Sequence, residues 1–151
     1  IDQTYSRRLR DFLAREEPEV LSSAQVQLLA IGRHVRLPFG RKVVVGRYER
    51  ENELLETCGV AGVLLTTVDH PGPTTLVPGS PARDEIEQAA RITAGYSDGR
   101  HERAVRVEVR RGGGRETGGR RREAGGKRQE AGGEVLAVEP MPREEIKSLM
   151  V

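Results

Sequence analysis

The sequence has few of the residues that build a large core. It contains no tryptophan, two phenylalanines and three tyrosines, and only 36% of its 151 residues are hydrophobic. Apolar residues usually make up nearly half of a globular domain. The core is therefore expected to be modest, to consist of Leu, Val, Ile and Ala, and to offer no large cofactor pocket; we expect no cofactor.

The sequence also lacks the marks of secretion, membrane insertion and common enzyme chemistry. A single cysteine, Cys58, permits no internal disulfide and favours a cytoplasmic location. No apolar run reaches the roughly 20 residues of a membrane span, and no signal-peptide layout precedes the first helix. Phosphate-loop, Gly-x-Ser-x-Gly and His-Glu-x-x-His motifs are missing. A small enzyme using Asp69, His70 and Cys58 stays open as a rival, although we favour turn roles for the first two and an apolar role for the cysteine.

Positive charge is concentrated in one tract, between Arg110 and Gly133. This tract holds eight basic residues against three acidic ones and nine of the 18 glycines, whereas the whole chain has a formal charge of only +2. Without large apolar residues the tract cannot pack into a core, so we predict a disordered, flexible Gly/Arg-rich loop there.

The remaining sequence alternates between helical and extended patterns, with Gly/Pro turns between them. We predict helices over residues 4–17, 49–58, 84–94 and 142–149. We predict strands over residues 24–31, 35–37, 42–46, 60–68, 74–77, 104–109 and 134–138. The irregular order favours an α+β fold, a small mixed sheet with helices packed mainly on one face.

A basic cluster lies on two of these strands and the turn between them, where several cations could face phosphates together. The alternative is that these long side chains cover strand edges. Arg47, which precedes a predicted helix, either binds phosphate beside the helix N-terminus or pairs with Glu51 or Glu53. The cluster comprises Arg33, His34, Arg36, Arg41, Lys42 and Arg47.

Four short motifs occur in a recognisable order. They are Gly32-Arg33-His34-Val35-Arg36-Leu37, Val45-Gly46-Arg47-Tyr48 with Asn52, Pro71-Gly72-Pro73, and Ala89-Ala90 with Tyr96-Ser97. In this arrangement, from about Tyr5 to Val109, the chain resembles the RNA-binding domain of NFACT proteins, and more closely the version attached to PP-loop ATPases of the tRNA thiouridine synthase kind. It departs from the family pattern at Tyr48, where Asn is common, and at Gly62–Thr66, which replaces the Asp-x-Trp-x-His-like segment of the translation-quality-control members.

The resemblance implies a non-catalytic domain that binds tRNA or another structured RNA for an upstream PP-loop ATPase, itself a tRNA-thiolating enzyme, with no membrane partner. Residues 1–18 would be a helix leading in from that upstream domain, and residues 19–151 the RNA-binding domain, with an insertion at 110–133. A module that only docks the ATPase domain is the second rival. The predicted RNA-binding residues are Arg33, His34, Arg36, Arg41, Lys42, Arg47, Asn52, Arg120, Arg121 and Arg122.

Overall fold

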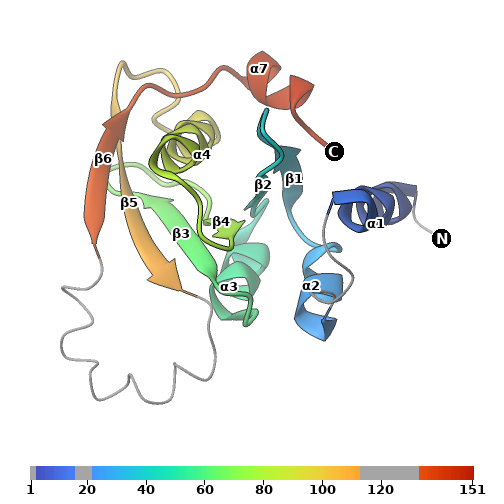
Figure 1. Cartoon of the computed structure of the whole chain (residues 1–151). Coiled ribbons are helices and arrows are strands. Elements are labelled where there is room, and N and C mark those ends of the chain that lie inside the picture. Colours follow the sequence, from blue (N-terminus) through green and yellow to red (C-terminus); the bar gives the residue numbers. More distant parts are fainter. Residues whose placement is uncertain (1–2, 16–21, 113–132) are drawn as a thin grey trace, which may run out of the picture.

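A six-stranded antiparallel sheet forms the centre of the protein. The computed structural model describes residues 3–15, 22–112 and 133–151. Every neighbouring pair of strands is antiparallel, and the order across the sheet is β1-β2-β4-β3-β5-β6 (Figure 1). The strands are β1 (Arg33–Arg36), β2 (Lys42–Val45), β3 (Gly62–Thr67), β4 (Thr75–Pro78), β5 (Val105–Gly112) and β6 (Glu134–Val138).

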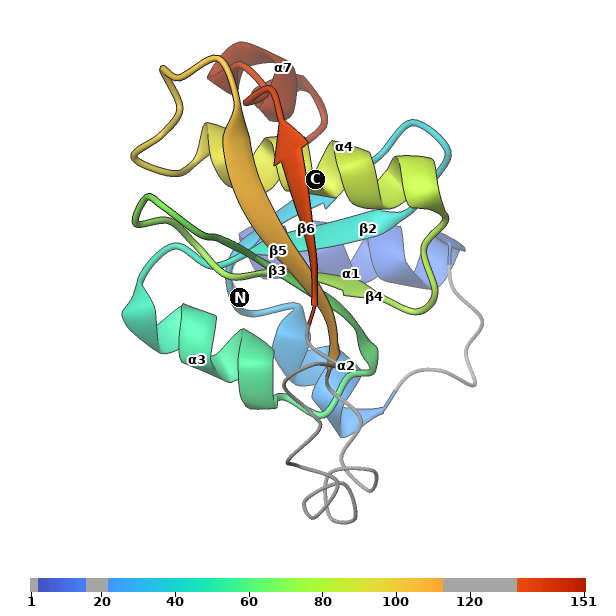
Figure 2. The ribbon, with the colours of Figure 1, turned by 90° about the vertical axis from the view of Figure 1, so that its left-hand side faces the viewer.

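Helices cover both faces of this sheet in the described parts of the chain. Figure 2 shows α4 and α7 on one side, with α2 and α3 on the other. The helices are α1 (Gln3–Arg15), α2 (Ser23–Leu28), α3 (Glu49–Thr57), α4 (Arg83–Gly95) and α7 (Arg143–Ser148). The α+β class is thus confirmed, whereas the expected mixed sheet is antiparallel and the helices are not gathered mainly on one face.

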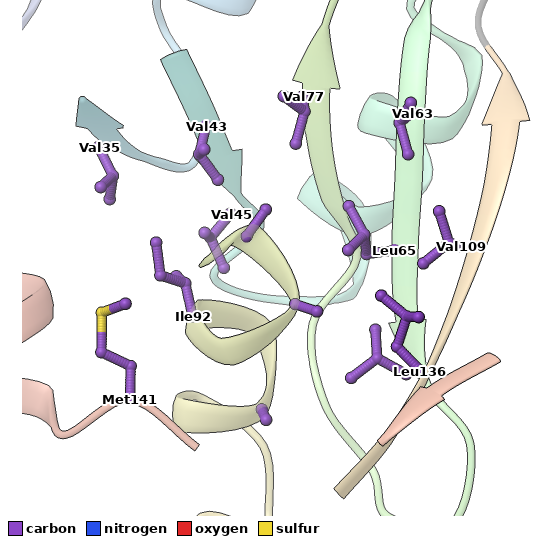
Figure 3. Close-up of a cluster of buried hydrophobic side chains, with 14 of the residues drawn as sticks. Val35, Val43, Val45, Val63, Leu65, Val77, Ile92, Val109, Leu136 and Met141 are labelled. Carbon is purple, nitrogen blue, oxygen red and sulfur yellow. The ribbon is translucent and has the colours of Figure 1, made fainter. Parts of the chain in front are cut away.

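The larger core cluster lies between the sheet and the α4 side. Val43 and Val45 of β2 pack with Ile92 of α4 and with Met141 and Ile146, which come from the segment leading into α7 and from α7 itself (Figure 3). Burial of each of these side chains stabilises the folded protein by roughly 1.5–3 kcal/mol. This cluster holds the C-terminal segment against β2. Arg143 is the first residue of α7 in that segment.

The second cluster explains why helices are needed on both faces. Val44 and Leu64 point away from α4 and pack with Leu28 of α2 and Leu55 of α3. Successive side chains of a strand face opposite sides, so a run such as Lys42–Val45, buried at every position, requires cover on both. This run could have predicted, from the sequence alone, that helices cover both faces of the sheet.

The predicted strand over residues 24–31 is wrong, because most of this segment belongs to helix α2. The Ser22 side chain accepts a hydrogen bond from the Gln25 amide at 3.2 Å and so caps the helix. Ala24, Leu28 and Ile31 then follow at helical spacing and pack together in the second cluster. The apolar period was therefore 3.6 residues and not 2.

The other predicted elements are confirmed, and within the described part of the chain their ends differ from the predicted ones by at most three residues. Gly59 follows α3 with a φ of +86°, the left-handed conformation expected of a C-terminal glycine. Strand β5 continues to Gly112, so Arg110 and Arg111 belong to the sheet and not to a loop. Residues 113–132 lie outside the described part. Among the described helices, none has the length and apolarity that crossing a membrane requires.

Candidate nucleic-acid interface

The four sequence motifs meet at one surface pocket of about 280 Å³. Arg33 comes from the first motif, Gly46, Arg47 and Asn52 from the second, and the Pro-Gly-Pro turn from the third. The fourth motif supplies Tyr96, at the C-terminal end of α4. The lining residues are Arg33, Gly46, Arg47, Asn52, Pro71, Gly72, Pro73, Tyr96, Asp98 and Arg143.

Glycines in these motifs allow close backbone contacts around the pocket. The Gly46 amide donates to the Thr74 carbonyl at 3.0 Å, and the Thr74 amide donates to Asn52 Oδ1 at 3.0 Å. A Cβ on Gly46 would overlap Asn52 Oδ1. A Cβ on Gly72 would come within 2.8 Å of both Ser97 Cβ and Thr67 Oγ1. The second, third and fourth motifs are therefore tied together by contacts that larger residues would prevent.

Two arginines flank the Tyr96 ring. The guanidinium carbons of Arg33 and Arg143 each lie 4.5 Å from the ring centroid, within the range of a cation–π interaction. Arg143 also donates from Nε to the Gly95 carbonyl at 2.9 Å. Arg143 was not predicted, because it lies about a hundred residues from the first motif in the sequence and only the fold brings the two together. The Tyr96 position was noted in the fourth motif but not as a site residue.

Arg47 is both a pocket residue and the exposed partner of a buried carboxylate, that of Glu51. Its Nε and Nη2 donate to the Glu51 carboxylate at 3.0 and 2.6 Å, and its backbone amide donates to the same group at 2.9 Å. Burial opposes ionisation of Glu51, but the Arg47 side chain and the backbone amides of Gly32 and Arg47 outweigh it and lower the pKa of Glu51 to about 2. The two roles predicted for Arg47, phosphate binding and pairing with Glu51, are therefore compatible.

The other residues of the predicted basic cluster do not line this pocket. Within β1 the reason is that alternate residues face opposite sides of the sheet. His34 is 1% exposed, donates from Nε2 to the carbonyls of Leu28 and Ile31, and accepts from Lys42 Nζ at 2.9 Å. Burial, and then the charges of Lys42 and Arg8, lower the pKa of His34 to about 3. His34 is therefore a neutral core residue, which contradicts its assignment as an RNA-binding residue.

Arg36 and Lys42 are also buried, against α1. Arg36 donates from Nε to Asp11 at 2.8 Å and from Nη1 to the Gly40 carbonyl at 2.7 Å. Lys42 lies 3.8 Å from the same Asp11 carboxylate. Burial raises the pKa of Asp11, but the Arg36 hydrogen bond and charge, with help from Arg15 and Lys42, lower it overall. These two cations fasten the N-terminal helix to the sheet, and both are 8% exposed, which contradicts their assignment as phosphate contacts.

Arg41 and Asn52 also make internal contacts, although neither is fully buried. Arg41 donates from Nε to Glu85 at 3.1 Å and from Nη1 to the Pro78 carbonyl at 3.3 Å, on the side of the domain away from Tyr96. Asn52 accepts the Thr74 amide hydrogen bond through its Oδ1 and is one of the residues that line the pocket. Arg120, Arg121 and Arg122 lie outside the described residues.

Comparison with known proteins decides the family. A family model described as "NFACT protein RNA binding domain" matches residues 32–124, which include Arg33, Arg47 and Tyr96. The chain belongs to this family. No curated protein sequence matches it.

A solved structure shares the fold of this NFACT-type RNA-binding domain. It is the C-terminal part of the fibronectin/fibrinogen-binding protein from Streptococcus suis, with a TM-score of 0.60 and 18% identity, over 98% of this chain and 67% of that one. At this identity the likeness extends to the fold alone. Arg143 and the helices α1 and α2 lie outside the residues matched to the NFACT family model.

The candidates for catalysis make ordinary structural contacts in this NFACT-type domain. Asp69 receives two hydrogen bonds from Arg106, at 2.9 and 2.7 Å, and the His70 ring packs on Gly99. Cys58 caps α3, where its thiol donates to the Leu55 carbonyl and its side chain joins the second core cluster. Among the described residues no cluster of His, Cys, Asp or Glu could hold a metal.

Proposed function

We propose that this domain binds the phosphate backbone of tRNA or another structured RNA through the pocket around Tyr96. The observation that carries the proposal is the meeting of three guanidinium groups, those of Arg33, Arg47 and Arg143, around one hollow. Asp98 is the one acidic residue among the lining residues. Guanidinium groups are well suited to phosphate because their planar donors match its oxygens.

Unused donors support this assignment. Within the described residues, Arg33 contacts Tyr96 and has no hydrogen-bond partner, while Arg143 uses only Nε. The pair with Glu51 engages Nε and Nη2 of Arg47 but not Nη1. Stacking on Tyr96 holds two of these groups in place, so less side-chain entropy is lost when they bind an anion. Contacts of this kind position RNA without reading its sequence.

We further propose that the domain serves a PP-loop tRNA-thiolating ATPase in the same longer protein, with residues 1–18 leading in from it and residues 19–151 as the RNA-binding unit. The resemblance of the four motifs to that version of the domain supports this context. Arg120, Arg121 and Arg122 would add an electrostatic contact with RNA that is independent of sequence.

Binding of the isolated domain to full-length tRNA over a range of salt concentrations tests the proposal. With about four phosphate contacts, the log–log slope of affinity against salt should be about −3, taking roughly 0.7 per phosphate. Arg33→Ala and Arg143→Ala should each weaken binding about tenfold, as expected for loss of a hydrogen bond to a charged group. Arg83→Ala is the matched control, since Arg83 lies at the opposite end of α4 from Tyr96.

Affinity that is independent of salt, or equal in the pocket variants and the Arg83 control, would contradict RNA binding at this pocket. The rival docking module makes a different prediction. It would bind the separately produced ATPase domain but show no tRNA binding even at low salt.

A further inference from the structure

An exposed aromatic side chain stands directly beside the pocket. Tyr48 follows Arg47 in the chain and is 57% exposed. The Arg47 guanidinium carbon lies 5.8 Å from the centre of the Tyr48 ring. Arg47 thus links the pocket, which it lines, to this second aromatic ring.

The fold gives no reason for an aromatic residue at this position. Tyr48 is the N-cap of α3, yet its side chain makes no capping hydrogen bond, and it belongs to neither core cluster. Ser, Thr, Asp or Asn would stabilise the helix better there. The exposed ring is therefore explained by neither packing nor capping.

Tyr48 also differs from Tyr96 in what its ring can receive. Tyr96 already contacts the guanidinium groups of Arg33 and Arg143, each at 4.5 Å. Tyr48 has one cation, Arg47, near the limit of a cation–π contact. Of these two rings, Tyr48 is the one with a large surface open to a ligand, and it adjoins positive charge that would hold a phosphate.

We propose that Tyr48 stacks an unpaired RNA base while the adjoining pocket holds the phosphate of the same backbone segment. This inference rests on the proposed function of the pocket. Aromatic side chains beside basic grooves bind single-stranded nucleic acid in this way, whereas bases inside a duplex are already stacked and paired. The ligand class is therefore RNA with splayed or single-stranded nucleotides, such as a loop or an end, and not continuous duplex.

Three short RNAs of equal length test this assignment: single-stranded oligouridylate, the same strand paired with oligoadenylate, and an abasic oligomer that keeps the phosphates. Tyr48→Ala should weaken binding of oligouridylate about 5- to 100-fold, the range for loss of one base stack. It should leave affinity for the duplex and the abasic strand unchanged, because neither offers a base to the ring. Tyr48→Phe should bind as the unmodified protein does.

Two controls separate this inference from the proposed function. Phe39→Ala removes another exposed aromatic, 89% exposed and in the turn after β1, and should not alter affinity. Arg143→Ala should weaken the binding of all three RNAs. If Arg143→Ala weakens binding but Tyr48→Ala matches Phe39→Ala, or weakens the abasic strand equally, base stacking is overturned and the phosphate pocket stands. If neither Arg143→Ala nor Tyr48→Ala weakens RNA binding, the proposed function fails as well. If Tyr48→Ala abolishes binding of a partner protein and leaves RNA binding unchanged, the assignment of this ring to RNA is overturned.

Discussion

Arg8 of α1 donates a hydrogen bond from Nη2 to the carbonyl of Gly32 at 2.9 Å. Gly32 directly precedes Arg33, and its amide donates to Glu51, the partner of Arg47. The N-terminal helix and α3 therefore hold the same residue, Gly32, through its carbonyl and its amide. Gly32 lies immediately before one pocket arginine, and Glu51 is the partner of another. This arrangement couples α1 to the pocket without any contact between α1 and the proposed ligand.

Replacement of Arg8 by Met should weaken RNA binding severalfold, although Arg8 is only 6% exposed. The carbonyls of Leu29 and Gly32 would lose their donor, at a cost of about 1–3 kcal/mol in unfolding free energy. Arg7→Ala, on the exposed face of the same helix, is the control. Binding should be measured by titration well below the thermal midpoint of each variant. Unchanged affinity in a folded Arg8→Met protein would show that α1 does not position the pocket.

Arg47→Ala should lower both RNA affinity and stability, whereas Glu51→Gln should lower stability more than affinity. Either substitution breaks the ion pair with Glu51, whose carboxylate is 3% exposed and also accepts hydrogen bonds from two backbone amides. We expect a loss of about 1–3 kcal/mol in unfolding free energy for Arg47→Ala, from denaturant titration. Only Arg47→Ala removes a pocket cation. Equal affinity losses in the two variants would mean that Arg47 acts only by holding α3.

His34 should make stability depend on pH between about 6.5 and 3. Its pKa is about 3 in the folded protein and 6.5 in the unfolded chain, so below pH 6.5 the unfolded state binds one more proton. The free energy of unfolding should therefore fall as the pH drops, by up to about 1.4 kcal/mol per pH unit. Glu51, whose pKa is lowered from 4.5 to about 2, loses its contribution only below about pH 4.5.

The interval between pH 6.5 and 5 thus isolates His34. His34→Gln keeps a donor for the Leu28 and Ile31 carbonyls and an acceptor for Lys42 but does not titrate in this range. Thermal melts of the two proteins should differ in slope against pH over this interval. Parallel curves would show that His34 takes up protons equally in the folded and unfolded states.

Replacing residues 113–132 by a short Gly-Ser turn should leave the thermal midpoint nearly unchanged. Val109 of β5 already pairs with Glu134 of β6, and Gly112 pairs with Gly62 of β3, so the strands on either side are fixed by the sheet. The same deletion removes Arg120–Arg122 and should reduce tRNA affinity and its salt dependence. A midpoint lowered by many degrees would show that this tract packs on the domain.

The sequence predicted most elements because their apolar periods and turn residues agree, as in α4 and its preceding Pro/Gly break. It did not predict which arginines are available. Arg33 and Arg36 look equivalent in the sequence, yet they face opposite sides of β1, and only Asp11, a residue of α1, decides that Arg36 is buried. Alternation along the strand could have separated Arg33 from His34 and Arg36. No local signal could have joined Arg143 to Tyr96, because that contact depends on how the C-terminal segment packs.

The register of the sheet places the pocket and Gly112, the last described residue before 113–132, at opposite ends. Thr67 and Thr75 lie toward the pocket, while Gly62 and Gly112 lie at the end where β5 leaves the sheet. The length of β3 alone separates these ends by about 17 Å. Under the proposed role of Arg120–Arg122, an RNA that engages both ends gains avidity, since the first contact raises the effective concentration of the second. Affinity should therefore rise once an RNA is long enough to contact Arg120–Arg122 while another part of it occupies the pocket.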